Sequence, residues 1–73
     1  MATLQLDTIG MRCPLPVLKL AATMPRINSG DVLEVKGDCE TFDYDIHKWC
    51  RQMGKVVLLM MKADGIFTAH IQF

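Results

Sequence analysis

This 73-residue chain lacks a long hydrophobic run. No apolar stretch approaches the roughly 18 to 20 residues that a membrane-spanning helix needs. The start of the chain, residues 1–7, also lacks the basic and then apolar layout of a secretory signal. The sequence therefore predicts a cytoplasmic protein that does not insert into a membrane.

A net charge is lacking as well, because eight basic side chains balance eight acidic ones. The long-range field that draws a protein to nucleic acid is therefore absent, and we expect no direct contact with nucleic acid. Hydrophobic residues make up 51% of the chain and charged residues 22%, which is the balance of a compact fold. At this length we expect one domain that spans residues 1–73.

Cysteine and histidine are sparse and widely spaced. The chain has three cysteines and two histidines but no C-x-x-C or H-x-x-x-H pair, so the signatures of a zinc site are missing. We expect no bound metal and no cofactor. An odd number of scattered cysteines also argues for a reducing compartment and against a secreted disulfide scaffold. The sequence does not place His47 or His70 beside a cysteine as a general base, which disfavours a Cys-His hydrolase.

Hydrophobic periodicity predicts the secondary structure. Leu4, Leu6 and Ile9 nearly alternate with polar residues before Gly10, which indicates a short first strand that ends in a loop. The same periodicity predicts helices over residues 14–24 and 42–53 and strands over residues 31–37, 56–61 and 66–73. The pair Asp64-Gly65 between the last two strands is typical of a hairpin turn.

The apolar positions of both helices should form the core. On the first helix these are Val17, Leu18, Ala21 and Met24, and on the second Phe42, Ile46, Trp49, Cys50 and Met53. We interpret Cys50, beside Trp49, as a packing residue. The methionines that we interpret in the same way are Met24, Met53, Met60 and Met61.

The predicted order is β-α-β-α-β-β. The simplest compact arrangement is a two-layer α/β sandwich, in which a mixed four-stranded sheet has both helices packed on one face. If the first two strands pair in parallel through the first helix, both end at the same rim of the sheet. Cys13 and Cys39 follow these strands and should lie together at that rim. The sequence leaves open whether their sulfurs are close enough to bond.

The segment Cys13-Pro14-Leu15-Pro16 places a thiol at the start of the first predicted helix. Pro14 and Pro16 fit a first helical turn, because the proline nitrogen there needs no intrahelical partner and the fixed φ suits a helix. We therefore interpret Cys13 as the N-cap residue, with its sulfur facing the N–H groups of Leu15 and Val17. The helix dipole then favours a thiolate over a thiol, which predicts a nucleophile or a sulfur carrier.

The two rim cysteines have opposite local charges. Cys13 has Arg12 beside it as a supporting cation, whereas Cys39 lies between Asp38 and Glu40. Cys13 should therefore be the better thiolate. Cys39 is either a second sulfur relay, a resolving thiol or an ordinary loop residue near a helix start.

Two further features near the rim each have alternative interpretations. The acidic residues Asp38, Glu40, Asp43 and Asp45 would complement the dipole of the second helix, repel anions from Cys39, or dock a basic partner. Met11, beside Cys13, would either form part of a docking patch or tuck under its loop.

The pattern Leu6-Asp7-x-x-Gly10-Met11-Arg12-Cys13-Pro14-x-Pro16-Val17 resembles the TusA family of small sulfur carriers, also called SirA-like proteins. The resemblance spans the whole chain and includes Gly30-Asp31-Val32-Leu33 and residues 45–54. It implies a two-layer α/β sandwich in which Cys13 carries sulfur as a persulfide. It also implies a sulfur donor, which is a cysteine desulfurase, a rhodanese-like protein or thiosulfate, and an acceptor protein in transfer-RNA thiolation, sulfur oxidation or a related pathway.

Two positions depart from the family pattern. Members commonly have Asp-Pro where this chain has Asp38-Cys39, and often a basic residue where it has Asp43. These differences weaken the assignment to transfer-RNA thiolation. Cys39 is similar to the YeeD-like branch, which implies thiosulfate supplied through a membrane transporter.

The leading hypothesis is a persulfide carrier in which Cys13 holds the sulfur and Arg12 supports it. The first alternative is a thiosulfate-handling sulfurtransferase that is assisted by Cys39 and works with a membrane transporter. The second is a non-catalytic redox-regulatory module that binds its partner through the Cys13 loop and Met11. The sequence does not choose the donor or the acceptor.

Overall fold

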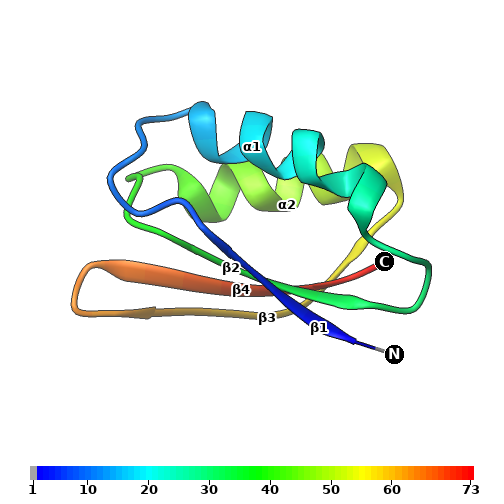
Figure 1. Cartoon of the computed structure of the whole chain (residues 1–73). Coiled ribbons are helices and arrows are strands. Elements are labelled where there is room, and N and C mark those ends of the chain that lie inside the picture. Colours follow the sequence, from blue (N-terminus) through cyan, green and yellow to red (C-terminus); the bar gives the residue numbers. More distant parts are fainter. Residues whose placement is uncertain (1) are drawn as a thin grey trace.

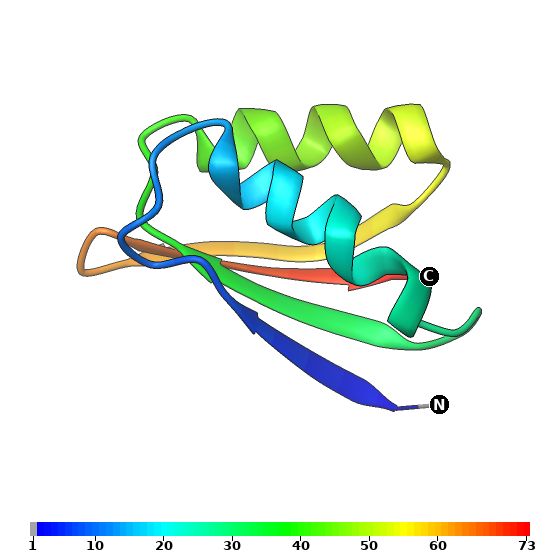
Figure 2. The same cartoon turned by 45° about the horizontal axis from the view of Figure 1, so that its top comes forward.

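A computed structural model describes residues 2–73 of the chain. Within them the elements are β1 (Thr3–Asp7), α1 (Leu15–Thr23), a short 3₁₀ helix η1 (Met24–Arg26), β2 (Val32–Gly37), α2 (Phe42–Met53), β3 (Val56–Ala63) and β4 (Ile66–Gln72). Both helices cover the same face of the sheet (Figures 1 and 2). The predicted element order and the two-layer α/β sandwich are confirmed. No helix in the described part of the chain is long and apolar enough to cross a membrane.

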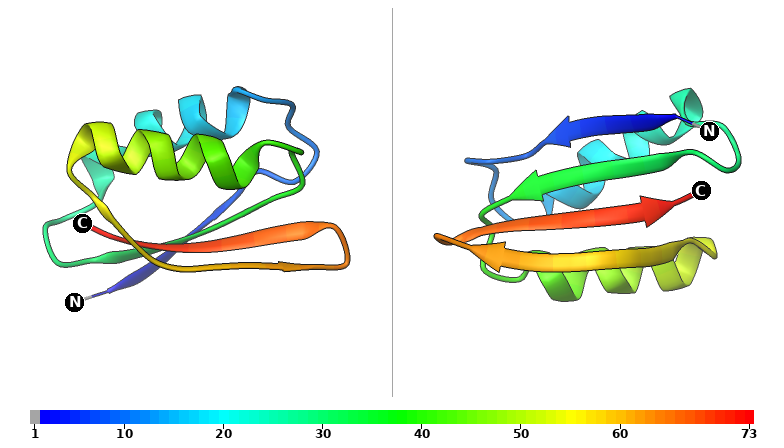
Figure 3. Two further views of the ribbon diagram at one scale, coloured as in Figure 1. Left: turned by 180° about the vertical axis from the view of Figure 1, so that it is seen from behind. Right: turned by 90° about the horizontal axis from the view of Figure 1, so that it is seen from below.

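The sheet is mixed, with the strand order β1-β2-β4-β3 (Figure 3). β1 and β2 are parallel, and β4 is antiparallel to both β2 and β3. In the register, Leu6 of β1 faces Val35 of β2, which in turn faces Ala69 of β4. Because the parallel pair ends at one rim, the loops that lead into α1 and α2 start side by side there.

The core lies between the helices and the covered face of the sheet. From the strands it contains Leu6, Leu33, Val35, Phe67, Ala69 and Ile71, and from the helices Leu20, Phe42, Ile46, Trp49 and Cys50. Strand residues on this face alternate with more exposed ones, as a sheet covered on one side requires. The rings of Phe42 and Phe67 stack with their centroids 5.4 Å apart and link α2 to β4.

The predicted apolar face of α1 is partly wrong. Pro16 and Leu20, one helical turn apart, are buried, whereas Leu18 is 58% exposed and Ala21 is also exposed. The error arose because apolar residues occur on every side of this helix, so no polar face defines its orientation. The helix also ends at Thr23, because Pro25 has no N–H to continue the α-helical hydrogen bonds and the chain tightens into η1.

Other differences from the predicted elements are local. Ile9 lies beyond β1 and is exposed, and β3 continues to Ala63. Met24 and Met60 pack against the core as predicted, but Met53 and Met61 are exposed. Met61 follows Met60 along β3, so its side chain points to the sheet face that the helices leave uncovered.

The predicted hairpin turn at Asp64-Gly65, between β3 and β4, is confirmed. Asp64 and Gly65 both have positive φ, at 53° and 77°. A two-residue turn with positive φ at both positions is the type I′ form, which matches the twist of the two strands.

Candidate functional site

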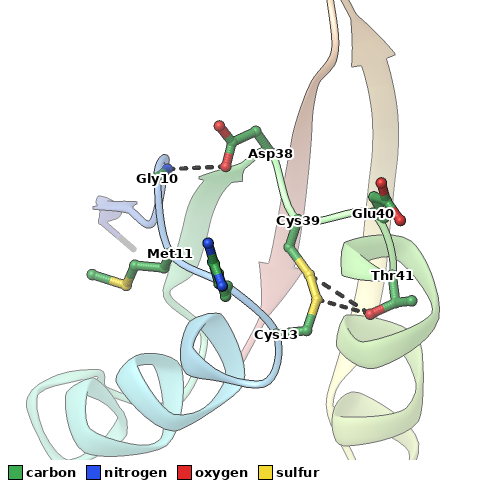
Figure 4. A pocket seen from close by; sticks show the side chains of 8 residues that line it. Gly10, Met11, Cys13, Asp38, Cys39, Glu40 and Thr41 are labelled. Atoms are coloured by element: carbon green, nitrogen blue, oxygen red, sulfur yellow. Dashed lines mark hydrogen bonds between the residues drawn. A yellow bond between two sulfur atoms is a disulfide. The ribbon is translucent and has the colours of Figure 1, made fainter.

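The site lies at the rim where β1 and β2 end. Gly10, in the loop before α1, donates its N–H to a carboxylate oxygen of Asp38, in the loop before α2, across 2.9 Å. This hydrogen bond ties the two cysteine-bearing loops together (Figure 4). Between the loops is an open pocket of about 490 Å³, lined by Gly10, Met11, Arg12, Cys13, Asp38, Cys39, Glu40 and Thr41.

Cys13 and Cys39 are joined by a disulfide. Their Cα atoms lie 5.9 Å apart, within the separation that a disulfide spans. The predicted meeting of the two cysteines at one rim is therefore confirmed, and the sulfurs are close enough to bond. Their accessibility differs, because Cys13 is exposed whereas Cys39 retains only 7% of its accessible surface.

Cys13 is not the N-cap residue of α1. Pro14 has that position, and no side chain caps the helix. The N–H of Leu15 donates to the carbonyl of Arg12, and that of Val17 donates to the carbonyl of Pro14. The backbone donors expected to face the sulfur are thus used within the first turn itself.

A threonine hydroxyl takes the place of these donors. Thr41 Oγ1 lies 2.8 Å from Cys13 Sγ as a hydrogen-bond donor and 3.6 Å from Cys39 Sγ. The same hydroxyl lies 2.9 Å from a carboxylate oxygen of Asp45, one turn along α2. Because a hydroxyl has one proton, Thr41 donates either to the sulfur or to the carboxylate at a given moment.

Thr41 is the site residue that the motif analysis missed. It directly precedes the apolar run of α2, and a Ser or Thr in that place is a typical helix N-cap. That signal was available in the sequence, but it would have assigned the hydroxyl to the helix backbone. In the structure no side-chain cap bond forms, and the hydroxyl faces the sulfurs.

The remaining residues predicted for the site lie at or beside the pocket. Arg12 is exposed and lines the pocket, and no ion pair joins it to an acidic group within residues 2–73. Met11 is half-buried and lines the same pocket. Pro14 and Pro16 shape the start of α1, with Pro14 exposed and Pro16 buried against the core.

The four acidic residues separate into different roles. Asp43 and Asp45 lie in the first turn of α2, where they complement the helix dipole as expected. Asp38 instead fixes the loop that carries Cys13, through its bond to Gly10. Glu40 is exposed and lines the pocket.

The third cysteine is buried in the core, and both histidines pair with acidic side chains. Cys50 is 2% exposed, and burial raises the pKa of its thiol to about 11, so its packing role is confirmed. His47 pairs with Asp43 across 2.7 Å, and His70 pairs with Glu34 across 2.9 Å.

A close approach beneath the site keeps the two loops in place. Thr8 donates both its N–H and its hydroxyl to the carbonyl of Lys36, each across 2.7 Å. A Cβ added at the next residue, Gly37, would lie 2.6 Å from ring atoms of Phe42 and from Thr8 Oγ1. Glycine is therefore required there, because the helix and the first loop both pack against this backbone.

Comparison with known proteins identifies the family of this chain. The family model described as Sulfurtransferase TusA matches residues 4–73. Three relatives share the name "Putative sulfur carrier protein". The protein from Aquifex aeolicus is 39% identical over 92% of this chain, that from Neisseria meningitidis serogroup A is 37% identical over 92%, and that from Bacillus subtilis is 32% identical over 94%.

The shared length differs among these relatives. The alignment covers 34% of the Aquifex protein and 37% of the Bacillus protein, but 90% of the Neisseria protein. The family match covers nearly all of the sequence, including both cysteine-bearing loops. The chain belongs to the TusA family of sulfurtransferases.

Proposed function

We propose that this protein carries sulfur as a persulfide on Cys13 and passes it to an acceptor protein. The supporting observation is the position of the Cys13 sulfur, which is exposed beside an open pocket and receives the hydroxyl of Thr41. A hydrogen bond donated to sulfur favours its anionic form, and the guanidinium of Arg12 adds positive charge at the same pocket.

The transfer needs little catalytic machinery. Once the Cys13–Cys39 disulfide is reduced, the Cys13 thiolate attacks the terminal sulfur of a donor persulfide. The sulfur–sulfur bond of the donor breaks, the donor leaves as a thiolate, and Cys13 becomes a persulfide. A thiolate of the acceptor then takes the terminal sulfur and returns Cys13 to a thiolate. Attack on sulfane sulfur is fast when the nucleophile is ionised and accessible.

The donor is a cysteine desulfurase, a rhodanese-like protein or thiosulfate, and the acceptor is a protein of a sulfur relay. Both exchange steps require a reduced Cys13, so we place the protein in the cytoplasm, where thiols are kept reduced. Direct binding of nucleic acid is not part of this function, because the chain has no net charge.

Mass spectrometry tests the carrier function. After incubation with a cysteine desulfurase and cysteine, the reduced protein should gain one sulfur atom that a dithiol removes. Cys13→Ser should lose this adduct, whereas Cys39→Ser should retain it. The matched control is Cys50→Ser, because Cys50 is buried away from solvent. An adduct that persists in Cys13→Ser would overturn the assignment.

The contact between the two cysteines favours a second candidate function, the processing of thiosulfate. Cys13 thiolate would take the sulfane sulfur of thiosulfate and release sulfite. Cys39 thiolate would then attack Sγ of the Cys13 persulfide, forming the Cys13–Cys39 disulfide and releasing sulfide. The two thiols supply the electrons that reduce sulfur to sulfide, and a cellular dithiol must reopen the disulfide.

Product stoichiometry separates these two functions. Without added dithiol, a thiosulfate-processing protein should release one sulfite and one sulfide per chain and stop in the disulfide form. Cys39→Ala should still release sulfite but lose the sulfide. Release of sulfite alone by the unmodified protein would favour the carrier function. Contact with a thiosulfate transporter belongs to this second candidate.

A further inference from the structure

We propose that the reduced site binds one thiophilic divalent cation of the zinc class through Cys13, Cys39 and Asp45. One ligand atom from each residue, two sulfurs and a carboxylate oxygen, lies within 4.8 Å of the others. No spacing motif indicates this group, because Cys13 lies in a loop far along the chain from Cys39 and Asp45. The fold brings the two cysteines together at the pocket and places the Asp45 carboxylate within reach of their sulfurs.

The types of ligand indicate the class of metal. Two thiolates and a carboxylate are the mixed sulfur and oxygen donors that suit Zn²⁺, whereas Mg²⁺ and Ca²⁺ require oxygen ligands. A tetrahedral zinc ion has bonds of about 2.0–2.3 Å, so its ligand atoms are about 3.3–3.8 Å apart. Small rotations of three side chains that are already in one cluster would reach that spacing. The open pocket leaves the fourth position to water.

Local charge also favours a cation in the reduced state. Opening the disulfide leaves two sulfurs next to the carboxylate of Asp45, and Glu40 lines the pocket that both cysteines line. If both thiols ionise, repulsion between these groups is offset by a divalent ion in their centre. Arg12, on the pocket wall, opposes this effect with a single charge.

Thr41 would orient one of the ligands. Its hydroxyl lies 2.9 Å from Oδ2 of Asp45, which fixes the carboxylate toward the sulfurs. Such outer-shell hydrogen bonds hold metal ligands in the correct orientation. In the binding step a phosphine or a cellular dithiol first reduces the disulfide. The two thiols then release two protons as their sulfurs bind the ion, so no further oxidant or reductant is needed.

Metal titration tests the site directly. The protein, reduced with a phosphine under argon, is titrated with Co²⁺, and its visible bands report tetrahedral geometry and thiolate ligation. We expect one Co²⁺ per chain, displaced by Zn²⁺. Cys13→Ser and Cys39→Ser should each weaken the thiolate band and the affinity. Loss of an outer-shell partner already costs about 10–100-fold in affinity, so Asp45→Asn should cost at least about tenfold.

The matched control is Asp43→Asn. Asp43 is an acidic residue of the same helical turn, but it pairs with His47 and not with the sulfurs. Equal metal affinity in Asp45→Asn and Asp43→Asn would overturn the proposed ligand set, as would unchanged binding in Cys39→Ser. One metal ion per two chains, with four thiolates, would also overturn it. Circular dichroism of each variant checks that the fold is intact.

The proposed metal site and the proposed carrier function can be rejected independently of each other. Asp45→Asn should still form the Cys13 persulfide in the desulfurase assay, because the attacking sulfur of Cys13 and its hydrogen-bond donor Thr41 are both retained. In the wild-type protein, Zn²⁺ should protect Cys13 from alkylation and slow persulfide formation. Loss of the persulfide adduct without loss of Co²⁺ binding would reject the carrier function alone, and the reverse result would reject the metal site alone.

Discussion

The hydroxyl of Thr41 lies 2.8 Å from Sγ of Cys13, although the two residues are 28 positions apart in the sequence. Thr41 belongs to the start of α2, whereas Cys13 precedes α1. The contact therefore connects the two helix starts through a single donor, and its effect on the sulfur is directly measurable.

In the protein with its disulfide reduced, Thr41→Val should make Cys13 react more slowly with iodoacetamide near neutral pH. The variant removes the donor that favours the thiolate, and a net hydrogen bond of about 1 kcal/mol corresponds to a shift of up to about one pH unit in the rate profile. Thr41→Ser should behave like the wild type. Thr23→Val is the matched control, because the Thr23 hydroxyl binds the carbonyl of Lys19 on α1. An unchanged profile in Thr41→Val would show that the hydroxyl does not influence the sulfur.

In the reduced protein, Arg12→Gln should slow sulfur loading from thiosulfate more than it slows the reaction of the Cys13 thiolate with a neutral trisulfide. Arg12 lines the pocket and forms no ion pair within residues 2–73, so its guanidinium attracts an anionic donor. The effect should be a few-fold at low salt and should shrink as ionic strength rises, because exposed charges are screened. The control is Arg26→Gln, an exposed arginine in η1. Equal slowing with both donors would contradict an electrostatic role.

Gly37→Ala should destabilise the fold. The new Cβ would lie 2.6 Å from the Phe42 ring and from Thr8 Oγ1, and neither can move freely in the packed interior. Overpacking of this kind typically costs about 1–3 kcal/mol in the free energy of unfolding. Urea denaturation should show a lower midpoint with an unchanged slope. Gly54→Ala is a useful comparison, because its added Cβ meets no atom and only its φ of 72° is strained.

Buried Cys50 predicts a loss of stability at high pH. Its pKa is raised from 9.0 to about 11 in the folded protein, so the unfolded chain releases this proton first. Its stabilising contribution is complete below pH 9.0 and is lost as the pH rises toward about 11. Each unit of difference corresponds to about 1.4 kcal/mol.

Comparison with Cys50→Ala isolates the contribution of this one thiol. The difference in unfolding free energy between the two proteins should narrow between pH 9 and pH 11, with the disulfide oxidised in both. A constant difference would mean that burial does not perturb Cys50. Alkylation should agree, since Cys50 should react only after unfolding.

The fold could be predicted because its signals are local and repeated. The alternation in β2, the long apolar stripe of α2 and the Asp64-Gly65 turn each point to one structure. α1 could be located but not oriented, because Leu15 and Leu18 lie on one side of it and Leu20 on another, and the sequence does not show which side meets the sheet. That choice is made by tertiary packing.

The candidate site was predictable in position but not in its hydrogen bonds. The parallel pairing of β1 and β2 brings Cys13 and Cys39 to one rim, and this follows from topology alone. The role of Thr41 depends on how two loops approach each other, which no spacing rule encodes. The expected N-cap at Cys13 was wrong because the N–H groups of the first turn found carbonyl partners closer along the chain.

The exposure of Leu15 and Leu18, immediately after the sulfur, limits how the protein meets its partners. Any protein that comes close enough to Cys13 to exchange sulfur also contacts the apolar surface formed by these two leucines, which are 48% and 58% exposed. Under the proposed carrier function, the sulfur donor and the acceptor protein thus compete for one binding surface. The donor must dissociate before the acceptor binds.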